Sequence, residues 1–143
     1  MTNALRFPAA DPPAAAAFFA AELAFEADPD DVYRDLLAGT AQGYVLVETR
    51  APEVFARRRI PGAINLPYRD LPERVDLDPA LVYVCYCESF QCNAATKGAL
   101  ALAQRGYRVK RLSGGITAWE QAGYPVEGDG QATAVVSQVA CHC

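Results

Sequence analysis

The sequence predicts an α/β fold, in which parallel strands form a sheet that helices cover on both faces. Short apolar runs typical of buried strands alternate along the chain with segments of helical spacing. This alternation favours parallel pairing, because right-handed crossovers return the chain to the same end of the sheet. Glu48, Cys87 and Gly114 follow expected strands, and ligands bind beyond the carboxyl ends of such strands. We therefore expect one site that several loops build together.

The N-terminal part of the chain is expected to form an arm and two helices. Residues 1–13 contain three prolines and no periodicity, which is typical of a loose arm. Pro12-Pro13 can begin a helix that continues to about residue 24. Residues 27–31 are expected to form a turn whose acidic side chains begin a second helix, which Gly39 ends.

The remaining elements follow in alternating order. We expect strands at residues 43–48, 63–66, 81–86 and 108–112, because these runs are short and apolar or flanked by turn residues. Pro52 begins a short helix, and residues 93–97 open a longer one that Gly106 ends. A last helix is expected at residues 116–121, with Trp119 in the core. Residues 126–143 are weakly patterned, and no element is predicted there.

Composition limits the classes of function. The chain has 143 residues, enough for one domain, and a net charge of −4, which argues against nucleic acid or an anionic membrane as partner. Residues 14–25 are too short to span a bilayer and lack the basic flank of an export signal. We therefore expect a cytoplasmic protein, in which cysteines are more often reactive than bridged. Cys85, inside a strand, is expected to be a small buried hydrophobe.

Cys87 lies where an expected buried strand gives way to a helix. Unpaired backbone N–H groups and the helix dipole stabilise a thiolate at such a position. We predict a cysteine nucleophile whose pKa is modestly lowered, with Lys97 as a nearby cation and Glu88 directed outward to solvent. The backbone amides after Cys87 are expected to form an anion or persulfide cradle, contributed by Glu88, Ser89, Phe90, Gln91, Cys92 and Asn93.

Four segments, taken in order, resemble the rhodanese-like domain family. They are Leu-Val-Glu-Thr-Arg-Ala-Pro-Glu at residues 46–53, Arg-Ile-Pro-Gly-Ala-Ile-Asn-Leu-Pro at 59–67, the strand-end Cys87, and Leu-Ser-Gly-Gly-Ile-Thr-Ala-Trp at 112–119. The resemblance implies a three-layer α/β/α fold with a five-stranded parallel sheet. It also implies transfer of sulfane sulfur through a cysteine persulfide. We expect an N-terminal arm and accessory helix at residues 1–28, the rhodanese-like domain at 29–126 and a C-terminal tail at 127–143.

Carried over by position, Cys87 matches the nucleophile of the family, and residues 87–92 match its six-residue active loop. Related phosphatases have a longer loop, so the loop length favours sulfur transfer over phosphatase or arsenate reductase activity. The chain departs from the family at Glu48, where Asp is usual, and at Arg59, where His is common. Cys92 stands where many members carry Arg or Lys, and this loss predicts weak binding of a dianionic donor.

The supporting residues have assigned roles. Glu48 and Arg50 are expected to form a structural pair at the site floor, while Arg59 belongs to a run of three arginines on a solvated face or at the cleft rim. Because the rhodanese-like family places this turn beside the active loop, the resemblance implies that Gly114 and Gly115 let the backbone approach that loop closely. Cys92 is interpreted either as a resolving cysteine or as a small side chain at a crowded helix start.

The expected partners are a small sulfane-sulfur donor and a thiol, cyanide or protein acceptor, with no cofactor, metal, nucleic acid or membrane. An alternative function is a non-catalytic rhodanese-like binding or redox-sensing module that uses Cys87 and Cys92. Cys141, His142 and Cys143 form either an unstructured tail or a second element that binds a soft metal or relays sulfur.

Overall fold

The computed structural model describes residues 2–129. One sheet of five parallel strands has the order β1-β5-β4-β2-β3, which confirms the predicted α/β fold. The strands are β1 (Glu26–Ala27), β2 (Tyr44–Glu48), β3 (Ile64–Asn65), β4 (Val82–Tyr86) and β5 (Arg108–Leu112). The sequence pattern missed β1, where a turn was expected, because two residues carry no periodicity. Pairing with β5 alone makes that segment a strand.

The helices lie close to the predicted positions. They are α1 (Pro12–Phe25), α2 (Pro29–Ala38), α3 (Pro52–Arg57), α4 (Ala94–Gln104) and α5 (Gly115–Gln121), with 3-10 turns η1 (Asn3–Leu5) and η2 (Tyr68–Asp70). Local chemistry sets the bounds of α2: the Asp28 carboxylate accepts the Asp30 N–H at 2.8 Å, and Gly39 ends the helix at φ 68°.

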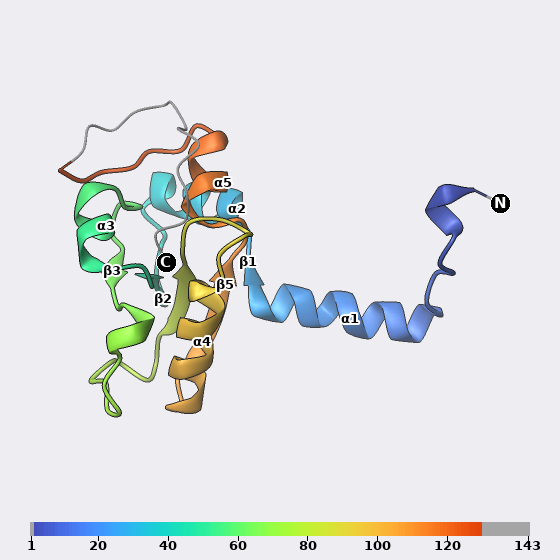
Figure 1. Ribbon diagram of the computed structural model, residues 1–143, viewed down its shortest axis with the longest axis horizontal. Helices are drawn as coiled ribbons and strands as arrows, with labels where there is room; N and C mark the ends of the chain where they lie inside the picture. Colours follow the sequence, from blue (N-terminus) through green and yellow to red (C-terminus); the bar gives the residue numbers. More distant parts are fainter. Residues whose placement is uncertain (1, 130–143) are drawn as a thin grey trace.

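Two apolar clusters, one on each face of the sheet, form the core. Val84 and Tyr86 of β4 pack with α2 and α5 on one face. Tyr83, Cys85 and Cys87 point to the opposite face, where α4 packs (Figure 1). Cys85 is fully buried, which confirms its predicted role as a small hydrophobe. Strand alternation therefore places Cys87 on the face of the sheet that α4 covers.

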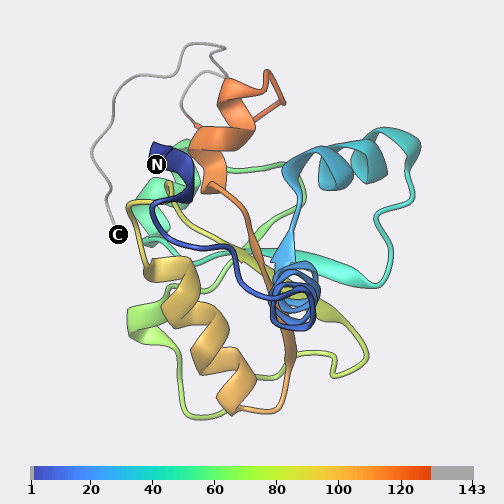
Figure 2. The ribbon, with the colours of Figure 1, turned by 90° about the vertical axis from the view of Figure 1, so that its right-hand side faces the viewer.

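Helix α1 stands apart from these layers. It projects away from the sheet and reaches the domain only at its C-terminal end (Figures 1 and 2). None of its residues is buried. Among residues 2–129, no helix is both long and apolar enough to cross a membrane.

Candidate active site

Cys87 follows β4 directly and lies at the base of a cavity of about 200 Å³. Its side chain is a free thiol, and only 2% of the residue is exposed. The cavity walls come from the active loop, the first turn of α4, the β5–α5 junction and the C-terminal end of α1 with β1. Its lining residues are Glu22, Glu26, Cys87, Ser89, Phe90, Cys92, Ala95, Arg111, Leu112, Ser113, Gly114 and Gly115.

Burial and hydrogen bonding act on the Cys87 thiol in opposite directions. Burial raises the pKa of the thiol, while hydrogen bonds from the backbone N–H groups of Ala95, Ser89, Glu88 and Ala94 lower it, and the net shift is upward. The expected lowering of this pKa is therefore wrong, because desolvation outweighs the amides. The cradle also differs from the prediction, since two of these amides belong to the first turn of α4.

The active loop is attached to the start of α5 through the backbone. The N–H of Ile116 donates to the Cys87 carbonyl at 3.0 Å, and that of Thr117 to the Glu88 carbonyl at 2.9 Å. Gly115, at φ +64°, makes this approach feasible, since a Cβ there would lie 2.5 Å from the Cys87 carbonyl oxygen. The predicted close approach at Gly114-Gly115 is confirmed for Gly115.

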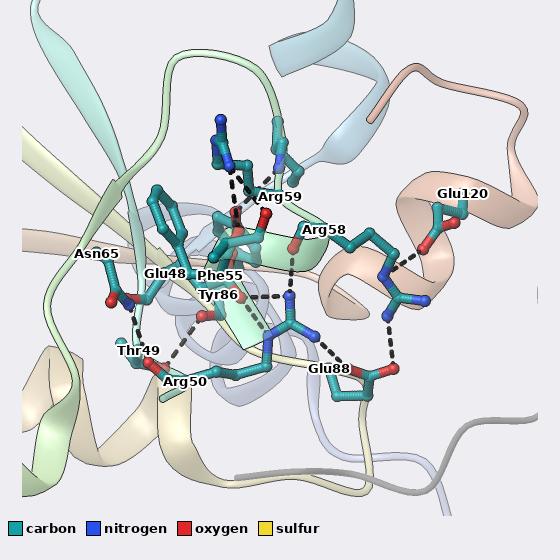
Figure 3. A network of polar contacts seen from close by, with 12 residues as sticks. Glu48, Thr49, Arg50, Phe55, Arg58, Arg59, Asn65, Tyr86, Glu88 and Glu120 are labelled. Carbon is teal, nitrogen blue, oxygen red and sulfur yellow. Dashed lines mark hydrogen bonds and ion pairs between the residues drawn. The ribbon is translucent and has the colours of Figure 1, made fainter. Parts of the chain in front are cut away.

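A buried ionic network lies behind the loop (Figure 3). The Glu88 residue is only 3% exposed, and its carboxylate binds the guanidinium groups of Arg50 and, at 2.7 Å, Arg58. The expectation that Glu88 points outward is wrong, because the buried Arg50 and the partly buried Arg58 hold the side chain inside. The residue next to the thiol therefore fixes the start of the loop.

Arg50 links this contact to the end of β2. It pairs with Glu48, as predicted, and its Nη2 donates to the Arg58 carbonyl at 3.0 Å. The Tyr86 hydroxyl donates to Glu48 Oε2 at 2.7 Å (Figure 3). Burial and the nearby Glu48 carboxylate raise the pKa of Tyr86, so the hydroxyl keeps its proton.

Glu120 of α5 adds a third carboxylate to the network. Its Oε1 lies 3.1 Å from Arg58 Nε, yet this oxygen has no hydrogen-bond partner among the described residues. Burial raises the pKa of Glu120 most strongly. The nearby Arg58 lowers this pKa and the Glu88 carboxylate raises it, so the net shift is upward. Two guanidinium groups thus face three carboxylates. Neither Arg58 nor Glu120 was singled out from the sequence, where Arg58 is only the middle of an arginine run.

Two predicted supporting cations lie elsewhere. Lys97 is exposed on α4, with its Nζ 5.3 Å from the centre of the Tyr68 ring. Arg59 lies over the Phe55 ring and forms an ion pair with Glu127 at 3.4 Å. Neither is among the groups that shift the pKa of Cys87. Arg59 therefore belongs to the packing of α3, and Lys97 to the outer surface of α4.

The other loop residues surround the thiol without a single common role. The Cys92 carbonyl oxygen lies 3.3 Å from Cys87 Sγ, and Cys92 Sγ accepts the Ala94 N–H at 3.4 Å. Ser89 Oγ accepts the Gln91 N–H at 3.2 Å, and Phe90 is 83% exposed at the cavity rim. The resolving role of Cys92 stays a prediction. Asn93 is the N-cap residue of α4. Cys141, His142 and Cys143 lie outside the described residues.

The cavity rim carries charges that the sequence pattern did not reveal. Arg111 of β5 forms an ion pair with Glu26 and donates to Thr96 Oγ1 at 2.7 Å. Ser113 Oγ donates to the second carboxylate oxygen of Glu26 at 3.2 Å. Glu22 of α1 also lines the cavity. The rim thus combines one cation with two carboxylates, brought together only because β1 pairs with β5.

Comparison with known proteins agrees with this geometry. The family model for the rhodanese-like domain matches residues 28–122, which include every element from α2 to α5, while β1 lies just before the match. The chain belongs to the rhodanese-like domain family. The match covers strands β2 to β5 and the active loop.

Similar proteins differ in what surrounds the shared domain. The chain is 40% identical over 85 residues to a protein named sulfurtransferase from Allochromatium vinosum, covering 57% of this chain and 77% of that protein. It is 36% identical over 83 residues to the HTH-type transcriptional regulator Rv0324 from Mycobacterium tuberculosis, covering 57% of this chain and only 37% of the regulator. The crystal structure of BH2092 from Bacillus halodurans has a TM-score of 0.77 at 35% identity, covering 82% of this chain and 87% of that one.

Proposed function

We propose that this rhodanese-like domain is a sulfurtransferase that moves sulfane sulfur through a persulfide on Cys87. The Cys87 thiolate attacks the outer sulfur of the donor, the donor S–S bond breaks, and the rest of the donor leaves as a thiolate or sulfite. A thiol, cyanide or protein acceptor then attacks the outer sulfur of the Cys87 persulfide and releases the Cys87 thiolate. The two steps together transfer one sulfur atom without net oxidation.

One observation carries this proposal: a free thiol among the lining residues of a small cavity, next to backbone N–H groups of the active loop and of the first turn of α4 that lower its pKa. Fixed amides stabilise developing negative charge without reorganisation, so they favour both the thiolate and a terminal persulfide sulfur. The cavity of about 200 Å³ suits a small donor group. Relatives named thiosulfate sulfurtransferase GlpE, such as the one from Pseudomonas syringae at 33% identity, support the same class of reaction.

The rim charges point to the donor class. Glu22 and Glu26 outnumber Arg111, which is itself paired with Glu26. A dianionic donor such as thiosulfate would meet net negative charge there, whereas a persulfide of low charge, or one that carries an amino group, would not. We therefore assign a low-molecular-weight thiol persulfide as the preferred donor. The same acidic balance disfavours nucleic acid as a partner.

The direct test replaces Cys87 with Ser and measures sulfur transfer from a thiol persulfide to cyanide. Transfer should fall to background, and mass spectrometry of the wild-type protein after donor treatment should find one added sulfur atom on Cys87. Cys85→Ala is the matched control, because Cys85 is fully buried two residues earlier and is not among the residues that line the cavity. Undiminished transfer by the Cys87 variant would refute the proposal.

A further inference from the structure

Helix α1 is apolar on every side, and nothing in the described structure covers it. Its sequence, PPAAAAFFAAELAF, contains one charged residue, Glu22. Phe18, Phe19, Leu23 and Phe25 are 57–76% exposed. A helix that is apolar all round is normally buried on all sides. The described part of one copy of the chain leaves this helix uncovered.

The helix is nevertheless held at its C-terminal end. The Glu26 N–H continues the helical hydrogen bonds to the Glu22 carbonyl, and Glu26 pairs with β5 as part of β1. Lys110 Nζ donates to the Leu23 carbonyl at 3.1 Å. From this fixed base the helix projects beyond the domain (Figures 1 and 2), so most of its surface is displayed to other molecules.

The exposed area is large enough for a stable interface. Leu5 and Phe7, before the helix, are 65% and 75% exposed and extend the same apolar segment. At these exposures, each of the six large side chains presents roughly 100–150 Å². Together they amount to roughly 700 Å², close to the ~800 Å² that each partner buries in a standard interface and above the largest patch of a typical monomer.

A matching groove lies beside the base of α1. It has a volume of about 370 Å³ and is lined mainly by apolar atoms. Leu100 of α4, 56% exposed, forms one wall. The other lining residues are Phe25, Glu26, Thr96, Ala99, Ala103, Val109, Lys110 and Arg111. When each of two copies offers both an apolar helix and an apolar groove, the same contact can form twice, which gives a symmetric, isologous interface.

Charge argues for a second copy over a membrane surface. The chain has no Lys or Arg between Arg6 and Arg34, so α1 has no cation to bind anionic lipid headgroups. The alanines at residues 16, 17, 20, 21 and 24 share one face of α1, on which another helix can approach closely. A partner helix and a partner groove together would cover the whole circumference of α1, as its composition requires.

We propose that α1 mediates a symmetric dimer, in which each α1 packs against the α1 and the α4–β5 groove of a second copy of this chain. In this arrangement the swapped helices bury both apolar surfaces reciprocally. The proposal concerns association only and does not depend on the sulfurtransferase chemistry.

The test measures the mass of the full chain in solution by light scattering across a range of micromolar concentrations. Wild type should have twice the 15.4 kDa mass of one chain. Leu23→Glu on α1 and Leu100→Glu in the groove should each weaken dimerisation at least about 100-fold, because each puts a charge into an apolar interface. Leu37→Glu is the matched control, since Leu37 is 69% exposed on α2 and belongs neither to α1 nor to the groove lining, and it should leave the dimer intact.

Circular dichroism should show that each variant keeps the wild-type fold, because all three side chains are exposed. A monomeric wild-type protein at every concentration would overturn the proposal, whether or not it binds neutral lipid vesicles. A dimer that survives Leu23→Glu or Leu100→Glu would do the same. Equal dissociation by Leu37→Glu would also contradict it, because the interface would then lie elsewhere.

Discussion

Cys87 is a buried thiol near hydrogen-bond donors, and burial and hydrogen bonding change its pKa in opposite directions. The backbone amides favour the thiolate, while removal from water favours the neutral thiol, and the second effect is the larger. Binding of the donor therefore begins with a mostly protonated nucleophile at neutral pH. A raised pKa also makes the thiol less prone to oxidation, since the thiolate is the species that oxidants attack.

This balance predicts a rate that rises with pH. Only the thiolate reacts with iodoacetamide, and the pKa of the Cys87 thiol in the folded protein is raised. The alkylation rate of Cys87 should therefore still be rising at the ordinary thiol pKa of about 8.5, without levelling off there. Mass spectrometry that resolves the modified cysteine measures the rate at each pH. Free cysteine is the reference, because its alkylation rate levels off above its own pKa. A plateau below pH 8 would show that the amides outweigh burial.

Glu26 is the residue whose charge should select the donor. In Glu26→Gln the rim loses a carboxylate and Arg111 loses its ion-pair partner, so the guanidinium becomes available to an anionic donor. We expect kcat/KM for thiosulfate to rise about 3- to 10-fold at low salt, with a smaller change for a thiol persulfide. Glu53→Gln on the exposed side of α3 is the matched control. An unchanged donor preference would show that the rim charges do not select the donor.

At the scale of elements, α5 positions the active loop through its first turn. Two backbone hydrogen bonds join α5 to the carbonyls of Cys87 and Glu88, and Gly115 provides the necessary clearance. The active loop begins at the end of β4, and the first turn of α5 holds the loop in place through these two hydrogen bonds.

Gly115→Ala should therefore displace the loop. The new Cβ would meet carbonyl oxygens at 2.5 and 2.8 Å, and we expect overpacking to cost about 1–3 kcal/mol and sulfur transfer to fall at least about 10-fold. Gly123→Ala is a close control, because Gly123 also has a positive φ of +83° but open space around it. That variant should lose about 1–2 kcal/mol of stability from backbone strain and keep its transfer rate. Urea denaturation and steady-state kinetics separate the two effects, and equal activity of both variants would contradict the role of α5.

Across the whole molecule, the ionic network ties together segments that are distant in sequence. Glu48 ends β2, Arg58 follows α3, Glu88 belongs to the active loop and Glu120 to α5. Arg50, 1% exposed, lies at the centre and contacts both Glu48 and Glu88. A buried charge is costly unless it is paired, so removal of different carboxylates should have different consequences.

Glu88→Gln removes the carboxylate that Arg50 and Arg58 share, and it should destabilise the protein by about 3–5 kcal/mol.

Glu120→Gln removes the surplus negative charge and should lower the free energy of unfolding by about 1 kcal/mol or less. Because burial raises the pKa of Glu120, its contribution to stability is fully present below the ordinary glutamate pKa and is lost as pH rises through its pKa in the folded protein. The stability of Glu120→Gln relative to wild type should thus improve as pH rises. Urea titrations at several pH values measure both effects, and an opposite trend would contradict the surplus-charge interpretation.

Local sequence was sufficient to predict much of the fold and the position of the thiol. Strand and helix periodicity predicted β2, β3, β4 and β5 within about two residues, and the strand-to-helix junction predicted where Cys87 lies. The strand periodicity and the strand-to-helix junction depend on neighbouring residues, so a sequence pattern contains them. The close approach at Gly115 was implied instead by the resemblance to the rhodanese-like family, which places this turn beside the active loop.

Tertiary structure decided the rest. β1 exists only because β5 offers it a partner, and the same pairing brings Glu26 to the rim beside Arg111. Glu88 turned inward because Arg50 and Arg58, 38 and 30 residues away in sequence, converge on it. The pKa of Cys87 followed from burial under α4 and the loop, which no local pattern measures. Desolvation and ion pairing depend on which groups meet in space, and only the folded chain determines that.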